Sequence, residues 1–277
     1  MKFQPVIKWS GSKRALSEEI LKYFPKNIDT YYEPFCGGCS MLFQLLNSDI
    51  KVKKYVCSDI NADLIKFFIE VKENPETIYE EYKKRWLEMI SFDEIKKKQE
   101  YYNQIRSSYN KTKNIYDFIF LSRTSANGLI RYNSKGEFNA PFHLTRNGIQ
   151  PETFKNIIYQ WSNKLKEKNV EFVNCNYLNI IPQKGDFLFL DPPYINTRGM
   201  YFGVINFEEF WNYLKGLECE YALTLDGKRN EIDNTYQVPI DVYSEHIYLE
   251  GKISGFKKMH KETEYVKESL YIKLLKE

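Results

Sequence analysis

Hydrophobic and polar positions follow two different periods along this chain. Short apolar runs, typical of buried strands, alternate with segments in which apolar residues recur at every third or fourth position, typical of amphipathic helices. Strands that alternate with helices in this way indicate a mainly parallel sheet with helices on both faces, so we predict an α/β fold. Strands are predicted at 29–34, 54–58, 170–174, 187–190, 221–225, 246–249 and 269–275, and helices at 40–46, 62–71 and 206–217.

The alternation is interrupted in the middle of the chain. Between residues 75 and 113 the period is helical and the surface is highly charged, so we interpret 75–150 as a helical domain inserted into a domain formed by 1–74 and 151–277. The insert has thirteen Lys and Arg against nine Asp and Glu, whereas the whole chain has 40 against 37. Basic and aromatic residues together favour contact with nucleic-acid phosphates and bases, although a solvated helical face would have the same composition.

Composition limits the class of protein. With 277 residues, 43% of them hydrophobic, the chain is expected to be globular. No apolar run approaches the roughly 18 residues that span a membrane, and residues 1–5 lack the apolar stretch of a secretory signal. Five cysteines, an odd number, fit a reducing compartment better than a disulfide framework. We therefore predict a cytoplasmic protein with no membrane partner.

The segment Asp191-Pro192-Pro193-Tyr194 has the chemistry to bind a flat base that has an amino group. It follows the apolar run 187–190, at the end of a predicted strand, where open α/β sheets bind ligands. The two prolines make a rigid turn that presents carbonyls. Asp191 and the Pro192 carbonyl can accept both amino hydrogens, which makes the nitrogen lone pair nucleophilic, while the Tyr194 ring stacks on the base. The alternative is an ordinary Asp-Pro turn that ends a strand.

A glycine turn follows the first predicted strand. Phe35, Gly37 and Gly38 stand between that strand and the start of a helix, and glycines let the backbone approach a small molecule closely. The pattern is neither the dinucleotide fingerprint nor the phosphate loop. Cys36 and Cys39 are spaced like metal ligands, but no second Cys/His pair follows at zinc spacing, so we predict no metal site.

Two further polar segments can complete a small-molecule cradle. Asp59 ends the second predicted strand, where a carboxylate commonly accepts hydrogen bonds from a ribose, and Asn61 is suited to cap the following helix. Near the N-terminus, Trp9 and Lys13 flank a turn, and Lys13 can serve as the counter-ion of a cofactor that has a carboxylate. Alone, this last segment would be only a loop.

Residues 123–142 contain two turn signals. Asn127-Gly128 and the cluster at 133–136 predict a β-hairpin or a protruding loop. This segment exposes Arg131, a residue able to make a bidentate contact with guanine. The alternative is a basic surface hairpin without a recognition role.

In this order, these segments resemble those of the Dam-type (alpha-group, D12 class) DNA adenine-N6 methyltransferases, over nearly the whole chain. The resemblance implies a Rossmann-like fold that binds S-adenosylmethionine (AdoMet), with an inserted, mainly helical target-recognition domain and no metal. It implies methyl transfer to adenine N6 in double-stranded DNA after the base is flipped out. The implied catalytic residues are Asp191, Pro192 and Tyr194. The implied AdoMet-binding residues are Trp9, Lys13, Phe35, Gly37, Gly38, Asp59 and Asp191.

The same resemblance implies how the DNA is recognised. The hairpin would enter the major groove, where Arg131 contacts a guanine and Leu129 and Pro141 touch thymine methyl groups. Further phosphate contacts are expected from the insert and from Lys257, Lys258 and Lys261 in the 252–267 segment. The implied DNA-binding residues are Arg123, Asn127, Leu129, Arg131, Asn133, Lys135 and Pro141.

Two features depart from the family pattern. Ala126 stands where members often have an aromatic residue that wedges into the base stack, and the region 225–229 also differs. We expect a short palindromic target, for which GATC is the family's commonest sequence, and a bacterial or phage enzyme with a restriction-modification or orphan role. Its expected partners are double-stranded DNA and a cognate restriction endonuclease, and its expected state is a monomer or weak dimer. Two other functions stay open: an RNA adenine or cytosine-N4 methyltransferase, and a DNA-binding protein on an inactive methyltransferase scaffold.

Overall fold

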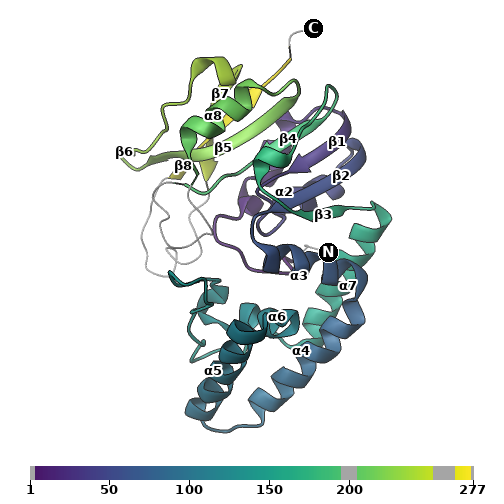
Figure 1. Ribbon diagram of the computed structural model, residues 1–277, viewed down its shortest axis with the longest axis vertical. Coiled ribbons are helices and arrows are strands. Elements are labelled where there is room, and N and C mark those ends of the chain that lie inside the picture. Colours follow the sequence, from purple (N-terminus) through teal and green to yellow (C-terminus); the bar gives the residue numbers. More distant parts are fainter. Residues whose placement is uncertain (1–3, 195–204, 252–265, 276–277) are drawn as a thin grey trace. The chain divides into compact units, whose positions relative to one another are not determined.

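The computed structural model describes residues 4–194, 205–251 and 266–275. Contacts divide this part of the chain into two compact units, a sheet unit and a helical unit, whose elements are labelled in Figure 1. Lys257, Lys258 and Lys261, which were expected to contact phosphates, lie outside the described residues. The sheet unit holds residues 12–60, 175–194, 205–251 and 266–275, and the helical unit holds residues 4–11 and 61–174.

Parallel strands form the centre of the sheet unit. β2 (Lys51–Asp59) lies beside β1 (Asn27–Glu33), β1 lies beside β4 (Phe187–Leu190), and β4 lies beside β5 (Glu220–Arg229), all in parallel register. The strand order reverses between β1 and β4, which makes this the topological switch point where open α/β sheets bind ligands. The predicted α/β fold with a mainly parallel sheet is confirmed.

Antiparallel strands extend the sheet beyond β5. β8 (Val266–Lys273) pairs with β5, and β7 (Glu245–Gly251) pairs with the far side of β8. The two-residue strand β6 (Ile232–Asp233) pairs with the end of β5. The antiparallel β8 therefore places residues from the last part of the chain beside β5, the neighbour of β4.

Apolar side chains from strands and helices bury the sheet. All four residues of β4 are buried, as expected for a central parallel strand. The amphipathic helix α8 (Phe207–Lys215) buries Phe210 and Leu214 in the cluster that contains the residues of β4 and β5. The seven-residue helix α2 (Ser40–Leu46) buries four apolar side chains, and the one-turn helix α1 (Ser17–Ile20) precedes β1.

A bulge interrupts the pairing of β5 with β8. The register shifts between Leu225 and Lys228, and Asp226 and Gly227 occupy the irregular positions. A β-carbon on residue 227 would lie 2.2 Å from the backbone carbonyl oxygen of Lys267, so only glycine fits there. The bulge matters because it fixes where the buried Asp226 side chain lies at the end of β5.

The helical unit contains, in chain order, α3 (Ala62–Glu73), α4 (Pro75–Ile90), α5 (Ile95–Thr112), α6 (Ile115–Thr124) and α7 (Pro151–Glu167), followed by the short strand β3 (Glu171–Asn174). α4 packs against α6 and α7, α5 packs against α6, and α3 packs against α6 and α7. None of the helices in the described ranges is long and apolar enough to cross a membrane. The role of residues 75–150 in target recognition stays a prediction.

Asparagine caps define the starts of two helices in this unit. The side chain of Asn61 accepts a hydrogen bond from the Leu64 amide at 3.1 Å, so its predicted capping role is confirmed. Asn114 caps α6 in the same way. Inside the unit, the Arg85 guanidinium binds the buried Asp117 carboxylate at 2.9 Å, which ties α4 to α6.

Replacing Gly227 by alanine tests the bulge. Because the new methyl group would meet backbone rather than a flexible side chain, Gly227→Ala is expected to lower the free energy of unfolding by about 1–3 kcal/mol. Gly216→Ala is the control, since a β-carbon there makes only ordinary contacts, the nearest at 3.5 Å. Urea denaturation of both variants is the measurement, and equal stability of the two would contradict this account of the bulge.

Candidate active site

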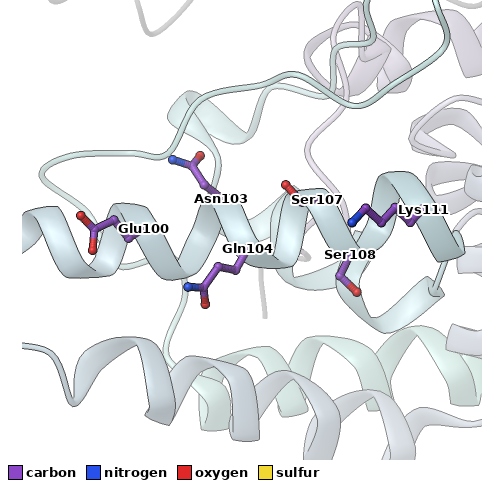
Figure 2. A pocket seen from close by; sticks show the side chains of 6 residues that line it. All are labelled: Glu100, Asn103, Gln104, Ser107, Ser108 and Lys111. Atoms are coloured by element: carbon purple, nitrogen blue, oxygen red, sulfur yellow. The ribbon is translucent and has the colours of Figure 1, made fainter.

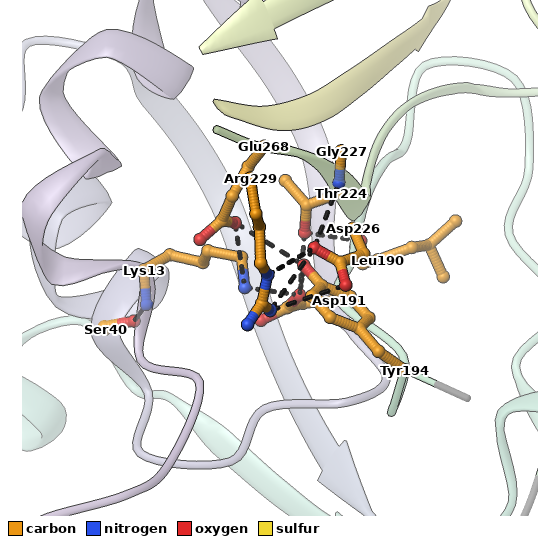
Figure 3. A network of polar contacts seen from close by, with 10 residues as sticks. All are labelled: Lys13, Ser40, Leu190, Asp191, Tyr194, Thr224, Asp226, Gly227, Arg229 and Glu268. Carbon is orange, nitrogen blue, oxygen red and sulfur yellow. Dashed lines mark hydrogen bonds and ion pairs between the residues drawn. The ribbon is translucent and has the colours of Figure 1, made fainter. Parts of the chain in front are cut away.

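Three donors hold the carboxylate of Asp191 at the switch point (Figure 3). The ammonium Nζ of Lys13 lies 2.8 Å from Oδ1, the Thr224 hydroxyl donates to the same oxygen at 2.8 Å, and the Tyr194 hydroxyl donates to it at 3.4 Å. All three donors therefore bind Oδ1. Within the described ranges no donor binds Oδ2, so that oxygen can accept a hydrogen from a substrate.

Lys13 is buried between two carboxylates. Its side chain is 3% exposed, and its ammonium lies 3.3 Å from Glu268 Oε2 as well as beside Asp191. Burial lowers the pKa of Lys13, but Asp191 and the other anionic groups around it more than compensate, so the pKa is raised well above its usual value. The Lys13 amide also donates to Ser40 Oγ at 3.1 Å, which fixes this residue against the start of α2. Lys13 is therefore a fixed cation at neutral pH.

Tyr194 completes the same network. Its ring centroid lies 5.1 Å from the Lys13 ammonium, and its hydroxyl also lies within 3.4 Å of Glu268 Oε2. Burial raises the pKa of Tyr194, and although Lys13 opposes this effect, Asp191 and Glu268 add to it. The phenol therefore stays neutral and acts as a hydrogen-bond donor. Pro192 is buried and Pro193 is half-buried.

A second ion pair lies at the bulge of β5. Asp226 is buried, and its carboxylate lies 3.4 Å from the Arg229 guanidinium and accepts a hydrogen bond from the Gly227 amide. Arg229 balances Asp226. Within the described ranges, the other charged groups of this network are one cation, Lys13, and the two carboxylates of Asp191 and Glu268. The site therefore favours a positively charged ligand or transition state.

Glu33 is a buried acid at the end of β1. Its Oε2 accepts hydrogen bonds from the Tyr31 hydroxyl at 2.7 Å and from the Leu42 amide at 2.8 Å. Because Leu42 lies in the first turn of α2, this carboxyl serves as a helix cap supplied by a distant residue. Burial, with a contribution from Asp191, outweighs these hydrogen bonds and raises the pKa of Glu33 to about 8.

The glycine turn lies beside the end of β2. The Gly37 amide donates to Asp59 Oδ2 at 3.2 Å, so the predicted turn and the predicted ribose ligand are in direct contact. The half-buried Phe35 ring lies 5.3 Å from the ring of Tyr177. A carboxylate, an aromatic ring and a glycine turn are the groups that a nucleoside cofactor with an amino-acid tail needs.

The thiols near this turn are buried. Burial raises the pKa of Cys36 to about 12 and also raises the pKa values of Cys39 and Cys57. Buried thiols with raised pKa values are poor nucleophiles. Among the described residues, no group of three or more His, Cys, Asp or Glu is arranged to hold a metal ion.

Comparison with known proteins identifies the family. The family model described as D12 class N6 adenine-specific DNA methyltransferase matches residues 9–268. The chain belongs to this family. A type II methyltransferase of Methanocaldococcus jannaschii, M.MjaIII, is 38% identical over 209 residues, which cover 70% of each chain.

Two further relatives are named DNA adenine methylases. The protein of Haemophilus influenzae is 32% identical over 200 residues, covering 70% of this chain and 65% of that protein. The protein of Escherichia coli K12 is 30% identical over 194 residues, covering 68% of this chain and 64% of that protein. The chain is therefore an adenine-specific DNA methyltransferase, which implies AdoMet as the methyl donor and DNA as the substrate.

The structure distributes the predicted site residues of this methyltransferase over both units. The predicted catalytic residues are in the sheet unit, together with all the predicted AdoMet-binding residues except one, and the predicted DNA-binding residues are in the helical unit. The sheet-unit set is Lys13, Phe35, Gly37, Gly38, Asp59, Asp191, Pro192 and Tyr194, and the helical-unit set is Trp9, Arg123, Asn127, Leu129, Arg131, Asn133, Lys135 and Pro141.

The predicted hairpin of the methyltransferase is stabilised by isolated antiparallel bridges, Ser125 with Phe142 and Tyr132 with Phe138. Asn127 and Gly128 both have positive φ angles, 57° and 68°, as a tight Asn-Gly turn requires. Within this segment, Leu129 is half-buried and Pro141 is exposed.

Arg131 is exposed but ordered within the hairpin. Its Nε donates to the Asn139 side chain at 2.8 Å and its Nη2 donates to the Asn139 carbonyl at 3.2 Å. Asn133, by contrast, is used inside the turn, where its side chain accepts from the amides of Lys135 and Glu137. The structure therefore gives Asn133 a stabilising role that the sequence did not indicate.

A cluster of cations lies near the start of the hairpin. Burial lowers the pKa of Lys8, and the nearby Arg123 and Arg146 lower it further. Arg123 is half-buried, donates to the Val6 carbonyl at 3.3 Å and lies over the Phe154 ring. No ion pair between these three cations and a carboxylate occurs in the part of the chain that the structure describes. Such a cluster suits an anionic ligand.

An open hollow runs along α5 of the methyltransferase (Figure 2). Ser108, one of its lining residues, donates to Asp117 at 2.8 Å and so belongs to the packing between α5 and α6. The hollow has a single cation and a single carboxylate among neutral polar groups, so it lacks the chemistry of a methyl-transfer site. Its lining residues are Glu100, Asn103, Gln104, Ser107, Ser108 and Lys111.

Sequence reasoning missed three groups that contact or adjoin the network around Asp191 and Lys13. Thr224 binds Asp191, and Glu268 binds Lys13. Both residues lie in strands whose sequence pattern predicts burial but not the polar partner of a given side chain. Glu33 stands inside the glycine-turn segment, and an acid among apolar strand residues was the available signal.

The buried carboxyl of Glu33 predicts a pH-dependent stability. Because its pKa is raised from 4.5 to about 8, the folded protein holds a proton that the unfolded chain releases, so stability falls as the pH rises through this window. Without ligands, the free energy of unfolding should fall by up to about 1.4 kcal/mol per pH unit between about pH 4.5 and 8 relative to Glu33→Gln. Urea denaturation of both proteins from pH 5 to 8.5 measures this effect, and parallel curves would show that the assignment is wrong.

Proposed function

We propose that this methyltransferase acts on an adenine flipped out of duplex DNA and that Asp191 accepts a hydrogen of its N6 amino group. The observation that supports this most directly is the convergence of Lys13, Thr224 and Tyr194 on one oxygen, Oδ1. The three donors fix the orientation of the carboxylate and leave Oδ2 to the substrate. Because an adenine inside the stack cannot reach such a group, the base has to leave the helix, at a cost of a few kcal/mol.

AdoMet is the proposed donor, and bound AdoMet supplies an electrophilic methyl group on a sulfonium. The residues present fit this cofactor: Asp59 for the ribose hydroxyls, Phe35 for the adenine ring, and the turn at Gly37 and Gly38 for close approach of the backbone. Lys13 was expected to be the counter-ion of its carboxylate, but the ammonium is buried between Asp191 and Glu268, so we propose that it orients Asp191 instead. Trp9 is proposed as a further contact. No metal is proposed.

The chain's own residues then prepare the amino group. Asp191 Oδ2 and the Pro192 carbonyl accept the two N6 hydrogens, so that the nitrogen lone pair leaves conjugation with the ring. Tyr194 stacks on the base and holds its plane. When the nitrogen gains the methyl group it has to release one proton, which Asp191 Oδ2 would accept from N6 and pass to solvent. The net negative charge of the network stabilises the positive charge that develops on the nitrogen. Positioning and electrostatics therefore provide the catalysis.

DNA recognition is proposed for the hairpin. Arg131, held by Asn139, would contact a guanine in the major groove, with Leu129 and Pro141 against thymine methyl groups. Asn127 and Lys135 are exposed in the same segment, and Arg123 in its cluster of cations suits a backbone phosphate. The proposed target is a short palindrome, for which GATC is one candidate.

The biological setting is also a proposal. Relatives named type II methyltransferases support a modification enzyme with a cognate restriction endonuclease, and relatives named DNA adenine methylases support an orphan role. We expect the enzyme to work in the cytoplasm, because both AdoMet and the DNA are found there. Its expected oligomeric state is a monomer or weak dimer.

Replacing Asp191 tests the proposed chemistry. Asp191→Asn keeps the shape but loses the second acceptor, and Asp191→Ala removes the group, so both should lower the single-turnover rate by at least about 100-fold while AdoMet binding is partly retained. Transfer of labelled methyl groups to duplex DNA, single-stranded DNA and RNA is the assay, with calorimetry for AdoMet. Near-normal turnover by either variant would refute the role, and preferential labelling of RNA by the wild type would refute the substrate.

Replacing Arg131 tests the proposed base contact. Arg131→Ala should lower the specificity constant on the cognate duplex by an amount equivalent to about 1–3 kcal/mol. On a duplex with the contacted base pair changed, the loss should be small, because a base contact discriminates between sequences. Lys135→Ala, an exposed cation in the same hairpin, is the matched control and should weaken all sites equally. Specificity constants on cognate and single-mismatch duplexes measure both, and a uniform loss for Arg131→Ala would make it a phosphate contact.

A further inference from the structure

The ammonium of Lys13 is shared by two carboxylates from distant parts of the sequence. Asp191, which follows β4, lies at 2.8 Å, and Glu268, on β8, lies at 3.3 Å. The Tyr194 hydroxyl lies within 3.4 Å of an oxygen of each carboxylate. The exposed fractions of the Asp191 and Glu268 side chains are only 19% and 23%, so both acids act on Lys13 at short range in a largely dry environment (Figure 3).

The charge balance depends on the second carboxylate. Asp226 is paired with Arg229, whereas the Lys13 ammonium is paired with both Asp191 and Glu268. If Glu268 were neutral, Lys13 and Asp191 would form a closed pair with no net charge. A carboxylate whose charge is cancelled in this way accepts a hydrogen from an amino group less strongly.

We propose that Glu268 is a positioning residue for methyl transfer, a role that rests on the proposed function of Asp191. Glu268 takes part of the Lys13 ammonium, so that Asp191 keeps enough negative charge to accept the N6 hydrogen. Its pairing in β8 with Leu249 of β7 fixes the carboxylate at that place. Glu268 itself contacts neither of the reacting atoms.

A variant series separates this electrostatic role from a packing role. Glu268→Gln keeps the shape and hydrogen-bonding capacity but loses the charge, whereas Glu268→Asp keeps the charge on a shorter side chain. An electrostatic role predicts that the Gln variant loses about 10- to 100-fold in single-turnover rate and that the Asp variant recovers part of it. A packing role predicts the reverse order, because Gln is the closer match in shape.

The experiment measures three quantities for the wild type and the variants. These are the single-turnover rate at saturating AdoMet and DNA, the dissociation constant of AdoMet by calorimetry, and the thermal midpoint. Glu250→Gln is the matched control, since Glu250 lies in the adjoining strand, is exposed and faces Lys267 across the pair. We expect Glu268→Gln to lower the rate, with the dissociation constant and the thermal midpoint close to those of the control.

The outcomes are distinguishable. An inactive wild type would refute the proposed function itself. An active wild type with a Glu268→Gln rate within twofold of Glu250→Gln would overturn the role of Glu268 alone. A weakened AdoMet affinity with an unchanged rate at saturation would also overturn it, because Glu268 would then act on cofactor binding.

Discussion

The buried ion pair between Lys13 and Asp191 is the interaction on which the site depends. Burying both charges costs several kcal/mol per ion, and this cost is offset only because the geometry is good and the remaining donors and acceptors are satisfied. Thr224 and Tyr194 supply two of those partners, and Glu268 supplies a third. Removal of Lys13 or Asp191 would leave an uncompensated charge in a largely buried site, which is why the network has to be considered as a unit.

The sheet topology makes this network possible. Lys13, Asp191 and Glu268 are separated by most of the chain, yet the switch point between β1 and β4 and the antiparallel return of β8 bring them within hydrogen-bonding distance. The same topology brings the glycine turn to the end of β2, where Gly37 binds Asp59. The glycine turn beside Asp59 and the fixed carboxylate of Asp191 thus lie at strand ends of one sheet, which is where open α/β sheets bind ligands.

The parts of the site that could be predicted are those with a local sequence signal. Asp191 precedes a rigid Pro-Pro turn that follows an apolar run, and the turn at Gly37 follows a strand. In both cases the residue type and its position after the strand were enough to predict that the residue lies at the edge of the sheet. Asn61 was predictable for the same reason, because an N-cap is a property of a few consecutive residues. The long, charged helices of the insert were indicated by their period.

The rest could not be predicted because it depends on strand pairing. Glu268 and Thr224 lie in strands where an alternating pattern indicates burial but not the neighbour across the sheet. The bulge at Gly227, which holds Asp226 in place, requires knowledge of the Lys267 carbonyl on the opposite strand. Asn133 was expected to contact DNA, yet it also stabilises its own turn, because an asparagine side chain can bond to the backbone a few residues ahead.

Adenine methylation by this enzyme can be measured by expressing the protein in a bacterial host that lacks DNA methylation and sequencing the host DNA for modified bases. We expect N6-methyladenine at one short motif, absent from a host that expresses Asp191→Asn, and the motif itself would give the recognition sequence. Unmodified adenine throughout the genome, from wild-type protein that is folded and binds AdoMet, would contradict the account.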